Sequence, residues 1–329
     1  MAAMAGLSLR RTRLNPAIRE LTREIRPVVG QFIQPLFVVE SLSEREAVPG
    51  LNDVWRDTPE SLVQQVRADL QKGVSKFLLF GVPAEKTTAN FDHSFTAAQI
   101  ARVRQEFSDD VWLAADVCLC SSTTHGHCGI VNEQGDYVDN EDSVAALATA
   151  ALQYAQAGAD CVAPSDMMDG RVAAIRTQLD NAGLDRTLIM SYSAKFHSGF
   201  YGPFRVAADS APGDNIKLTD RASYQIDPAR PSDAFLSSQR DAEEGADILM
   251  VKPGMPYLDV LADLSARIAK PWAVYQTSGE SAALELLTQA GLARRERINA
   301  EAWTAFLRAG AAMIISYDAR HAHDWLSSE

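Results

Sequence analysis

Two lysines follow apolar runs that have the composition of β-strands. Lys195 ends the segment Ile-Met-Ser-Tyr-Ser-Ala-Lys, and Lys252 ends Asp-Ile-Leu-Met-Val-Lys. A lysine at a strand end is commonly a solvated residue whose stem covers apolar surface. Burial, however, lowers a lysine pKa and supplies a neutral amine that attacks a ketone to form a Schiff base. Two such lysines in one chain indicate a site that captures carbonyl groups covalently.

A second group of reactive side chains lies further toward the N-terminus. It comprises Cys118, Cys120, His125, His127 and Cys128. Clustered cysteines in a large chain of cytosolic character are more often metal ligands or catalytic groups than disulfides, and three soft thiolates suit zinc. A structural zinc site would take one of the histidines as fourth ligand, whereas a catalytic site leaves that position to water or substrate. The spacing leaves both open, together with chance clustering of inert thiols.

The composition limits the class of protein. The 329 residues are 47% hydrophobic and 22% charged, and the net charge is −12. These values fit a folded chain with a sizeable core, and the acidic balance argues against nucleic-acid or anionic-membrane partners. No apolar stretch approaches the roughly 20 residues that span a bilayer. We therefore expect a cytoplasmic protein that acts on small molecules.

The elements that must position these residues alternate along the chain. Strand-like runs are predicted at 35–39, 76–82, 111–117, 160–163, 187–192, 247–251, 272–276 and 313–317. Helices are predicted at 60–71, 97–107, 143–157, 171–181, 233–244, 257–269, 281–289 and 302–308. Gly158, Gly245 and Gly310 stand where helices pass into strands, as left-handed glycines that end a helix do.

This unbroken βα alternation predicts one α/β domain, a (β/α)8 barrel over residues 31–329. A doubly wound sheet is the alternative, but the glycine-rich phosphate fingerprint expected after its first strand is missing. Chemistry in such barrels gathers at the carboxyl ends of the strands. The polar residues predicted to converge there are Asp116, Cys118, Cys120, Ser165, Asp166, Lys195, Lys252, Ser278 and Tyr317.

Residues 199–231 form a long stretch without a predicted element. The segment is rich in Gly, Pro, Asp and Ser and directly follows Lys195. A loop of this length inside a compact domain is usually an active-site lid or disordered. Its position favours a lid, a name kept below for residues 199–231.

Several long motifs together resemble one known family. They are Asp116-Val-Cys-Leu-Cys with His125-Gly-His-Cys-Gly, Ser191-Tyr-Ser-Ala-Lys-Phe with Tyr201-Gly-Pro-Phe-Arg, Met250-Val-Lys-Pro-Gly-Met-Pro-Tyr-Leu-Asp, Pro35-Leu-Phe-Val-Val-Glu, Ala163-Pro-Ser-Asp-Met-Met-Asp-Gly-Arg and Tyr275-Gln-Thr-Ser-Gly-Glu. From about Asn15 to Tyr317 the chain is similar to the porphobilinogen synthase (5-aminolevulinate dehydratase) family. Its members are (β/α)8 lyases of tetrapyrrole and haem biosynthesis, which condense two 5-aminolevulinates into porphobilinogen with loss of two waters.

The resemblance implies a role for each matching residue. Lys252 would form the Schiff base with the substrate that becomes the propionate side, and Lys195 with the acetate-side substrate. Lid residues Arg205, Arg221 and Gln225 would hold the acetate-side carboxylate. Ser278 and Tyr317 would hold the other carboxylate, although read without the resemblance they are ordinary strand-end hydroxyls. Pocket walls would come from Phe204, Tyr192, Tyr201 and Tyr275.

The same resemblance bears on metal and proton transfer. Cys118, Cys120 and Cys128 would hold a catalytic zinc that keeps an open position. Asp116 and Ser165 would contact the propionate-side amine. Asp116 is a candidate for proton transfer, and a simple counter-ion to the lysines is an equal alternative.

One departure concerns magnesium. Family members with an allosteric magnesium carry a glutamate fifteen residues before the Schiff-base lysine, where this chain has Ser237. Asp233 lies one helical turn earlier, and helix geometry displaces its carboxylate by about 6 Å. We therefore expect no allosteric magnesium. The lid is also somewhat long around residues 211–219, which bears on the placement of Arg221.

Two other functions are compatible with part of this pattern. A class I aldolase uses a Schiff-base lysine in a barrel, but it needs a single lysine and no cysteine cluster. A catalytically inactive zinc-binding barrel would bind metal without turnover. The second lysine argues against the first function, and the complete set of matching residues argues against the second.

Residues 1–30 are arginine-rich and precede the first predicted strand. The resemblance implies that this N-terminal arm wraps a neighbouring subunit in a homo-octamer built of dimers, with a hexamer as the alternative assembly.

Overall fold

The computed structural model describes residues 9–213 and 216–327, and in these ranges parallel strands close into an eight-stranded barrel. The barrel strands, in spatial order, are β1 (Phe32–Val39), β4 (Lys76–Val82), β5 (Trp112–Val117), β8 (Cys161–Pro164), β9 (Leu188–Lys195), β10 (Ile248–Lys252), β11 (Trp272–Tyr275) and β12 (Met313–Ile315). Pairing of β12 with β1 closes the ring. The predicted barrel is confirmed, and the doubly wound alternative is wrong.

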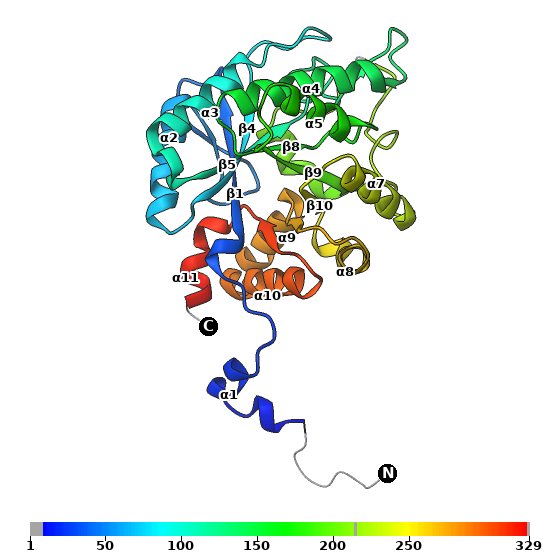
Figure 1. The fold of residues 1–329 in the computed structure, drawn as a ribbon. Coiled ribbons are helices and arrows are strands. Elements are labelled where there is room, and N and C mark those ends of the chain that lie inside the picture. Colours follow the sequence, from blue (N-terminus) through cyan, green and yellow to red (C-terminus); the bar gives the residue numbers. More distant parts are fainter. Residues whose placement is uncertain (1–8, 214–215, 328–329) are drawn as a thin grey trace.

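Helices surround this ring (Figure 1). They are α2 (Pro59–Gln71), α3 (Ser94–Phe107), α4 (Asn140–Gln156), α5 (Arg171–Asn181), α7 (Pro231–Glu243), α8 (Leu258–Arg267), α9 (Ser278–Gln289) and α10 (Arg295–Arg308), with α11 (Ala322–Ser327) following β12. Short strands β2 (Glu46–Ala47), β3 (Trp55–Asp57), β6 (Ile130–Val131) and β7 (Val138–Asp139) extend the loops. The predicted elements agree within a few residues, apart from α10, which begins seven residues before the predicted start. Gly158, Gly245 and Gly310 have φ of 103°, 107° and 104°, as predicted for helix-ending glycines.

Alternating side chains build two apolar layers. On β1, Ile33 and Phe37 point into the barrel, whereas Leu36 and Val38 pack outward against the helices. This two-residue period follows from the pleat of a strand. The inner layer also contains Met190 and other inward-facing side chains of the remaining strands. It closes the barrel interior below the mouth and leaves the strand ends free to carry polar groups.

A bulge between β9 and β10 interrupts this period. Leu249 pairs with Ser191 and Val251 with Ala194, so β9 contains one more residue than β10 over the same length. An extra residue re-aims the side chains that follow it. Lys195 and Lys252 consequently become paired neighbours at the ends of the two strands. The lysines are the last residues of the strands, not the residues after them as the sequence predicts.

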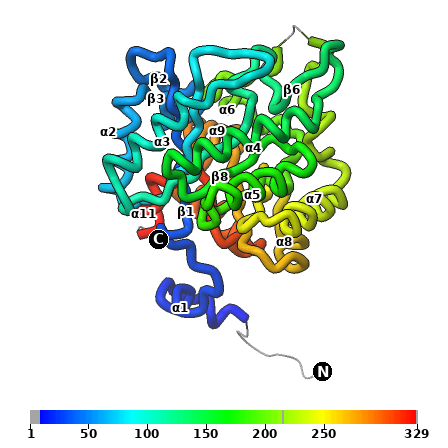
Figure 2. The backbone as a smooth tube through the Cα atoms, turned by 45° about the horizontal axis from the view of Figure 1, so that its top comes forward, coloured from blue at the N-terminus to red at the C-terminus, as the bar shows by residue number. Residues whose placement is uncertain are grey.

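The lid is more regular than predicted. A 3-10 turn (η4, Gly199–Tyr201) leads into helix α6 (Gly202–Ala207), which packs on α9 (Figure 2). The expectation of a segment without elements is therefore wrong for its first part. The extra length predicted around 211–219 falls partly on residues 214–215, which lie outside the described residues.

Residues 9–31 extend away from the barrel as an arm that contains α1 (Pro16–Leu21) (Figures 1 and 2). Residues 1–8 of the predicted arm lie outside the described residues. Leu14 and Leu21 on the arm are 55% and 80% exposed. Subunit contact by the arm stays a prediction.

Candidate active site

Lys252 lies among aromatic rings at the mouth of the barrel. Its Nζ is 3.8 Å from the ring centre of Tyr275, 4.9 Å from Phe204 and 5.0 Å from Tyr192. Burial and the neighbouring ammonium of Lys195 lower the pKa of Lys252 to about 7, although nearby carboxylate and thiol groups oppose the shift. At neutral pH a large share of this amine is therefore unprotonated and nucleophilic.

Lys195 is held by the loop that follows β8. It is buried, and its Nζ donates a hydrogen bond to the Ser165 carbonyl oxygen. Asp116 lies nearby on β5 and keeps part of its side chain accessible to the mouth. Burial raises the pKa of Asp116 to about 6, against the charges of the two lysines and the Ser165 hydroxyl. Asp116 Oδ1 has no partner among the described residues, which leaves it free for a ligand.

The three predicted cysteines meet after β5. Their Sγ atoms all lie within 4.8 Å of one another, and those of Cys118 and Cys120 are 3.3 Å apart. Hydrogen bonds from the thiols of Cys118 and Cys120 hold the pKa of Cys128 well below its ordinary value. A thiolate surrounded by two further thiols is a donor set that suits a soft divalent ion. The cluster can therefore hold a metal.

The two histidines of this loop do not join the cluster, as far as the described residues show. His127 Nδ1 is 3.1 Å from the Tyr224 hydroxyl, and its Nε2 is 3.1 Å from the Leu218 carbonyl oxygen. His125 Nδ1 accepts a hydrogen bond from the His127 amide. His125 Nε2 has no partner among the described residues, but only the three Sγ atoms are grouped closely enough to share an ion, which favours three cysteines with an open position.

Hydrogen bonds attach the lid to the cysteine loop, the segment 118–128 that carries the three cysteines. Arg221 Nη2 donates to the carbonyl oxygens of Gly126 (2.9 Å) and Ser210 (2.5 Å). Burial opposes its charge, but the sulfur groups of Cys128 and Cys120 raise the Arg221 pKa above its ordinary value. Arg221 Nε and both amide atoms of Gln225 are buried without partners among the described residues. Such groups are costly unless a ligand satisfies them.

Arg205 belongs to the same part of the lid. It lies on α6, next to Phe204, and its Nε is likewise buried without a partner in the described chain. The charge of Arg221 adds to the effect of burial in lowering the Arg205 pKa. Two arginines whose charges act on each other, each with a buried Nε that has no partner among the described residues, indicate an anion-binding site.

The predicted hydroxyl pair is divided between two elements. Ser278, the first residue of α9, accepts a hydrogen bond from the Phe204 amide on its Oγ (2.9 Å). Tyr317 lies two residues beyond β12 and accepts a hydrogen bond from the Tyr275 hydroxyl (3.2 Å). Tyr201 is buried beside Lys252, at 5.6 Å from its Nζ, and bonds the Phe196 carbonyl oxygen.

Some residues of the site were not predicted from their sequence context. Arg171 on α5 is fully buried and bonds Ser191 and Asp241, which ties the loop after β8 to β9 and α7. Glu280 accepts hydrogen bonds at the start of α9. The signal for Glu280 was present, because Thr277-Ser-Gly-Glu280 has the spacing of a capping box. No comparable local signal marks Arg171.

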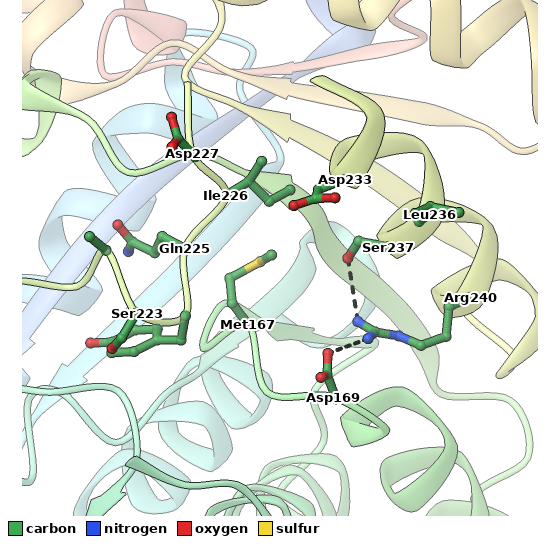
Figure 3. Close-up of a pocket in the computed structure, with 12 residues that line it drawn as sticks. Met167, Asp169, Ser223, Gln225, Ile226, Asp227, Asp233, Leu236, Ser237 and Arg240 are labelled. Carbon is green, nitrogen blue, oxygen red and sulfur yellow. Dashed lines mark hydrogen bonds and ion pairs between the residues drawn. The ribbon is translucent and has the colours of Figure 1, made fainter. Parts of the chain in front are cut away.

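A cavity of about 510 Å³ lies between the second half of the lid and α7, and Gln225 is among its lining residues (Figure 3). Figure 3 shows Arg240 bonded to Asp169 and to Ser237, whose Oγ accepts at 3.3 Å. Ser237, the residue that departs from the magnesium-binding pattern, is therefore engaged by an arginine. The absence of an allosteric magnesium stays a prediction.

The fold and this site together define a (β/α)8 barrel whose mouth carries two paired, buried lysines beside a cluster of thiols. The chain belongs to the delta-aminolevulinic acid dehydratase family, whose model matches residues 7–325. No helix in the described ranges is long and apolar enough to cross a membrane.

Relatives match over nearly the whole chain. The delta-aminolevulinic acid dehydratase of Bacillus subtilis is 40% identical over 322 residues, which cover 97% of each chain. That of Methanothermobacter thermautotrophicus is 43% identical over 315 residues and 94% of each chain. A solved structure of the Toxoplasma gondii enzyme, in complex with its reaction product porphobilinogen, has a TM-score of 0.92 at 37% identity and covers 97% of this chain and 91% of its own.

Proposed function

We propose that this chain is a lyase that condenses two molecules of 5-aminolevulinate into porphobilinogen, with loss of two waters, in tetrapyrrole and haem biosynthesis. The observation that carries the proposal is the pairing of Lys195 and Lys252 at one barrel mouth. A reaction that joins two ketones benefits from two amines, because each amine can activate and hold one ketone as an iminium. Membership of the delta-aminolevulinic acid dehydratase family supports the same reaction.

Lys252 begins the chemistry on the propionate-side substrate. Its neutral Nζ attacks the ketone carbon, one proton is taken up from the surroundings, the carbonyl oxygen leaves as water, and a protonated imine links substrate and protein. A pKa near 7 supplies this amine without a separate base. Tyr192, Tyr201, Tyr275 and Phe204 form apolar walls that exclude water from the imine.

Lys195 forms the corresponding imine with the ketone of the acetate-side substrate. Arg205, Arg221 and Gln225 bind its carboxylate, and their unpartnered nitrogen and oxygen atoms support this role. Bidentate hydrogen bonds from arginine suit a carboxylate. The lid thus positions the acetate-side molecule over the lysines.

Other residues of the mouth bind the second carboxylate and the amine in this proposal. Ser278 and Tyr317 bind the propionate-side carboxylate, and Ser165 and Asp116 contact the propionate-side amine. Asp116 has a pKa of about 6, so it can accept a proton near neutral pH and release it again. This behaviour favours proton transfer over a fixed counter-ion.

Cys118, Cys120 and Cys128 hold zinc in this proposal, because their thiol groups converge within ligand distance of a single ion. Bound there, zinc would supply a Lewis acid that polarises the acetate-side ketone or positions its amine. All four cysteines are unpaired in the described structure, which supports a reducing compartment and hence a cytoplasmic protein.

We propose that the chain assembles into a homo-octamer built of dimers, with a hexamer as the alternative.

The test is porphobilinogen formation from 5-aminolevulinate by the purified chain, alone, after treatment with a zinc chelator, and after zinc is restored. Activity that chelation removes and zinc restores is the expected result. Activity that is indifferent to chelation would remove zinc from the proposal and keep the reaction. No turnover under any metal condition would favour an inactive barrel, and cleavage of an aldol substrate in its place would favour a class I aldolase.

A further inference from the structure

Glu280 is a buried carboxylate that joins two turns at the mouth of the barrel. Its side chain accepts hydrogen bonds from the Met255 amide, from the Gly254 amide (3.2 Å), and from both the amide and the hydroxyl of Thr277 (2.6 Å each). Only 2% of Glu280 is exposed. A carboxylate offers acceptor sites alone, which matches a position at which every surrounding group is a donor.

Each of the two turns adjoins a residue of the proposed site. Gly254 and Met255 are the second and third residues after Lys252. Pro253, which lies between Lys252 and Gly254, has no amide hydrogen to donate. Thr277 is the N-cap of α9 and directly precedes Ser278. One carboxylate therefore connects the backbone that carries the Schiff-base amine to the backbone that carries the proposed carboxylate ligand.

The surroundings leave these turns little freedom. A Cβ atom added at Gly254 would lie 2.7 Å from the Phe306 ring, and one added at Gly279 would lie 2.6 Å from the Cα of Phe200. Both distances are shorter than ordinary van der Waals contact. The turns are packed against α10 and the start of the lid, so Glu280 acts within a closely fitted frame.

We propose that Glu280 is a positioning residue that sets the separation between the Lys252 amine and the Ser278 hydroxyl. The inference rests on the proposed function, in which these groups bind the ketone and the carboxylate of one substrate. Those substrate groups are joined by two methylene groups, so the two anchoring points must match a chain of fixed length. A misplacement of about 1 Å at such a site can reduce rates by about 100-fold.

The substitution Glu280→Gln isolates this role. Glutamine keeps the size of the side chain, but its NH2 group must face at least one amide that donates to Glu280 in the native chain. The turns should then move apart, while each lysine keeps its apolar surroundings. Thr277→Val removes one donor to the carboxylate and serves as a milder variant. Glu285→Gln, on the same helix, is the matched control, because Glu285 pairs with Arg295 and not with either turn in the described structure.

The experiment measures how far a substrate carboxylate assists imine formation. Levulinate, which has a ketone and a carboxylate, and 2-pentanone, which has only the ketone, are each incubated with the purified full-length chain and cyanoborohydride. Lys252 Nζ bonds to the ketone carbon, water leaves, and hydride from cyanoborohydride reduces the iminium to a stable secondary amine. Peptide mass spectrometry locates the adduct, and the ratio of trapping efficiencies for the two ketones is the readout.

We expect Glu280→Gln to lower the levulinate to 2-pentanone ratio by about tenfold or more, with a smaller loss of about fivefold for Thr277→Val and no change for Glu285→Gln. Ser278→Ala should lower the ratio as well. General damage to the fold would reduce trapping of both ketones alike and leave the ratio unchanged. An unchanged ratio in Glu280→Gln, or in Thr277→Val should Glu280→Gln not fold, would overturn the role of Glu280. Failure of the wild-type chain to trap levulinate at Lys252 would instead overturn the proposed function itself.

Discussion

At the scale of single residues, the site combines groups whose ordinary protonation states have been changed by their surroundings. Lys252 is among aromatic rings, Asp116 lies beside Lys195 and Lys252, and Cys128, whose pKa is lowered, lies beside the thiols of Cys118 and Cys120. Each shift follows from burial or from a named neighbour. In the proposed function they serve as a nucleophile, a proton carrier and a metal ligand near neutral pH.

Lys252 should control the pH dependence of imine formation. Its pKa is lowered to about 7, so the neutral amine is scarce below that pH and predominates above it. The initial rate of levulinate trapping at Lys252 should therefore rise with pH, pass its midpoint near 7 and reach a plateau by about pH 9. The measurement is adduct formation followed by mass spectrometry. A rate that keeps climbing beyond that range without a plateau would indicate an ordinary, solvated lysine.

Cys128 should govern metal content. Substitution Cys128→Ser removes one of the three converging thiols, the one whose pKa is lowered, so zinc affinity should fall by more than the about 10–100-fold that loss of an outer-shell partner costs. Elemental analysis after dialysis against a competing chelator measures it. Cys161→Ala is the control, because Cys161 lies in β8 inside the barrel core and outside the cluster. Equal zinc in both variants would remove the cysteine cluster as the metal site.

At the scale of elements, the sequence predicted the order of strands and helices but not how two of them end. Apolar runs and glycines mark the βα units, since they reflect local periodicity. The bulge in β9 is not local, because it depends on pairing with β10. If inward and outward side chains alternated strictly from Met190 along β9, Lys195 would point away from the barrel interior. That Lys195 points inward could therefore be inferred only from the chemistry that it shares with Lys252. The helical start of the lid was missed because Gly202-Pro-Phe-Arg205 opens with residues typical of turns.

The lid should depend on Arg221 for its attachment to the cysteine loop. Arg221→Lys keeps the charge, but a single ammonium cannot reproduce the guanidinium fork that bonds Gly126 and Ser210 and still faces a substrate carboxylate. The KM for 5-aminolevulinate should rise about tenfold or more, with faster proteolysis inside residues 199–231. Arg230→Lys is the matched control, because Arg230 is an exposed arginine at the end of the same lid whose one ion pair in the described ranges is with Asp233 on α7. Similar KM values in both variants would contradict a special role for Arg221.

At the scale of the whole molecule, the described part of the N-terminal arm leaves several apolar side chains uncovered. Residues 9–31 extend from the barrel and expose leucines that a neighbouring subunit could bury (Figures 1 and 2). The closed barrel and the converging polar residues could be anticipated from the sequence, because a barrel brings all strand ends to one mouth. The direction of the arm could not, since local periodicity does not specify how a terminal segment leaves the barrel.

Assembly should require the arm. A chain that lacks residues 1–30 should keep a folded barrel but lose the octamer and yield smaller species, as measured by sedimentation velocity with circular dichroism to check the fold. Leu21→Ser should weaken assembly in the same direction, because it replaces an exposed apolar side chain of the arm. An octamer that persists after removal of the arm would refute this part of the account.

The central claim is that two lysines of one barrel mouth bind two ketone substrates covalently. The most direct measurement incubates the purified chain with 5-aminolevulinate and cyanoborohydride, and then maps every modified lysine by peptide mass spectrometry while porphobilinogen formation is followed in parallel. We predict adducts confined to Lys252 and Lys195, loss of porphobilinogen formation as Lys252 becomes modified, and no turnover by Lys252→Ala. Full activity in Lys252→Ala, or adducts only at lysines outside the mouth, would contradict the account.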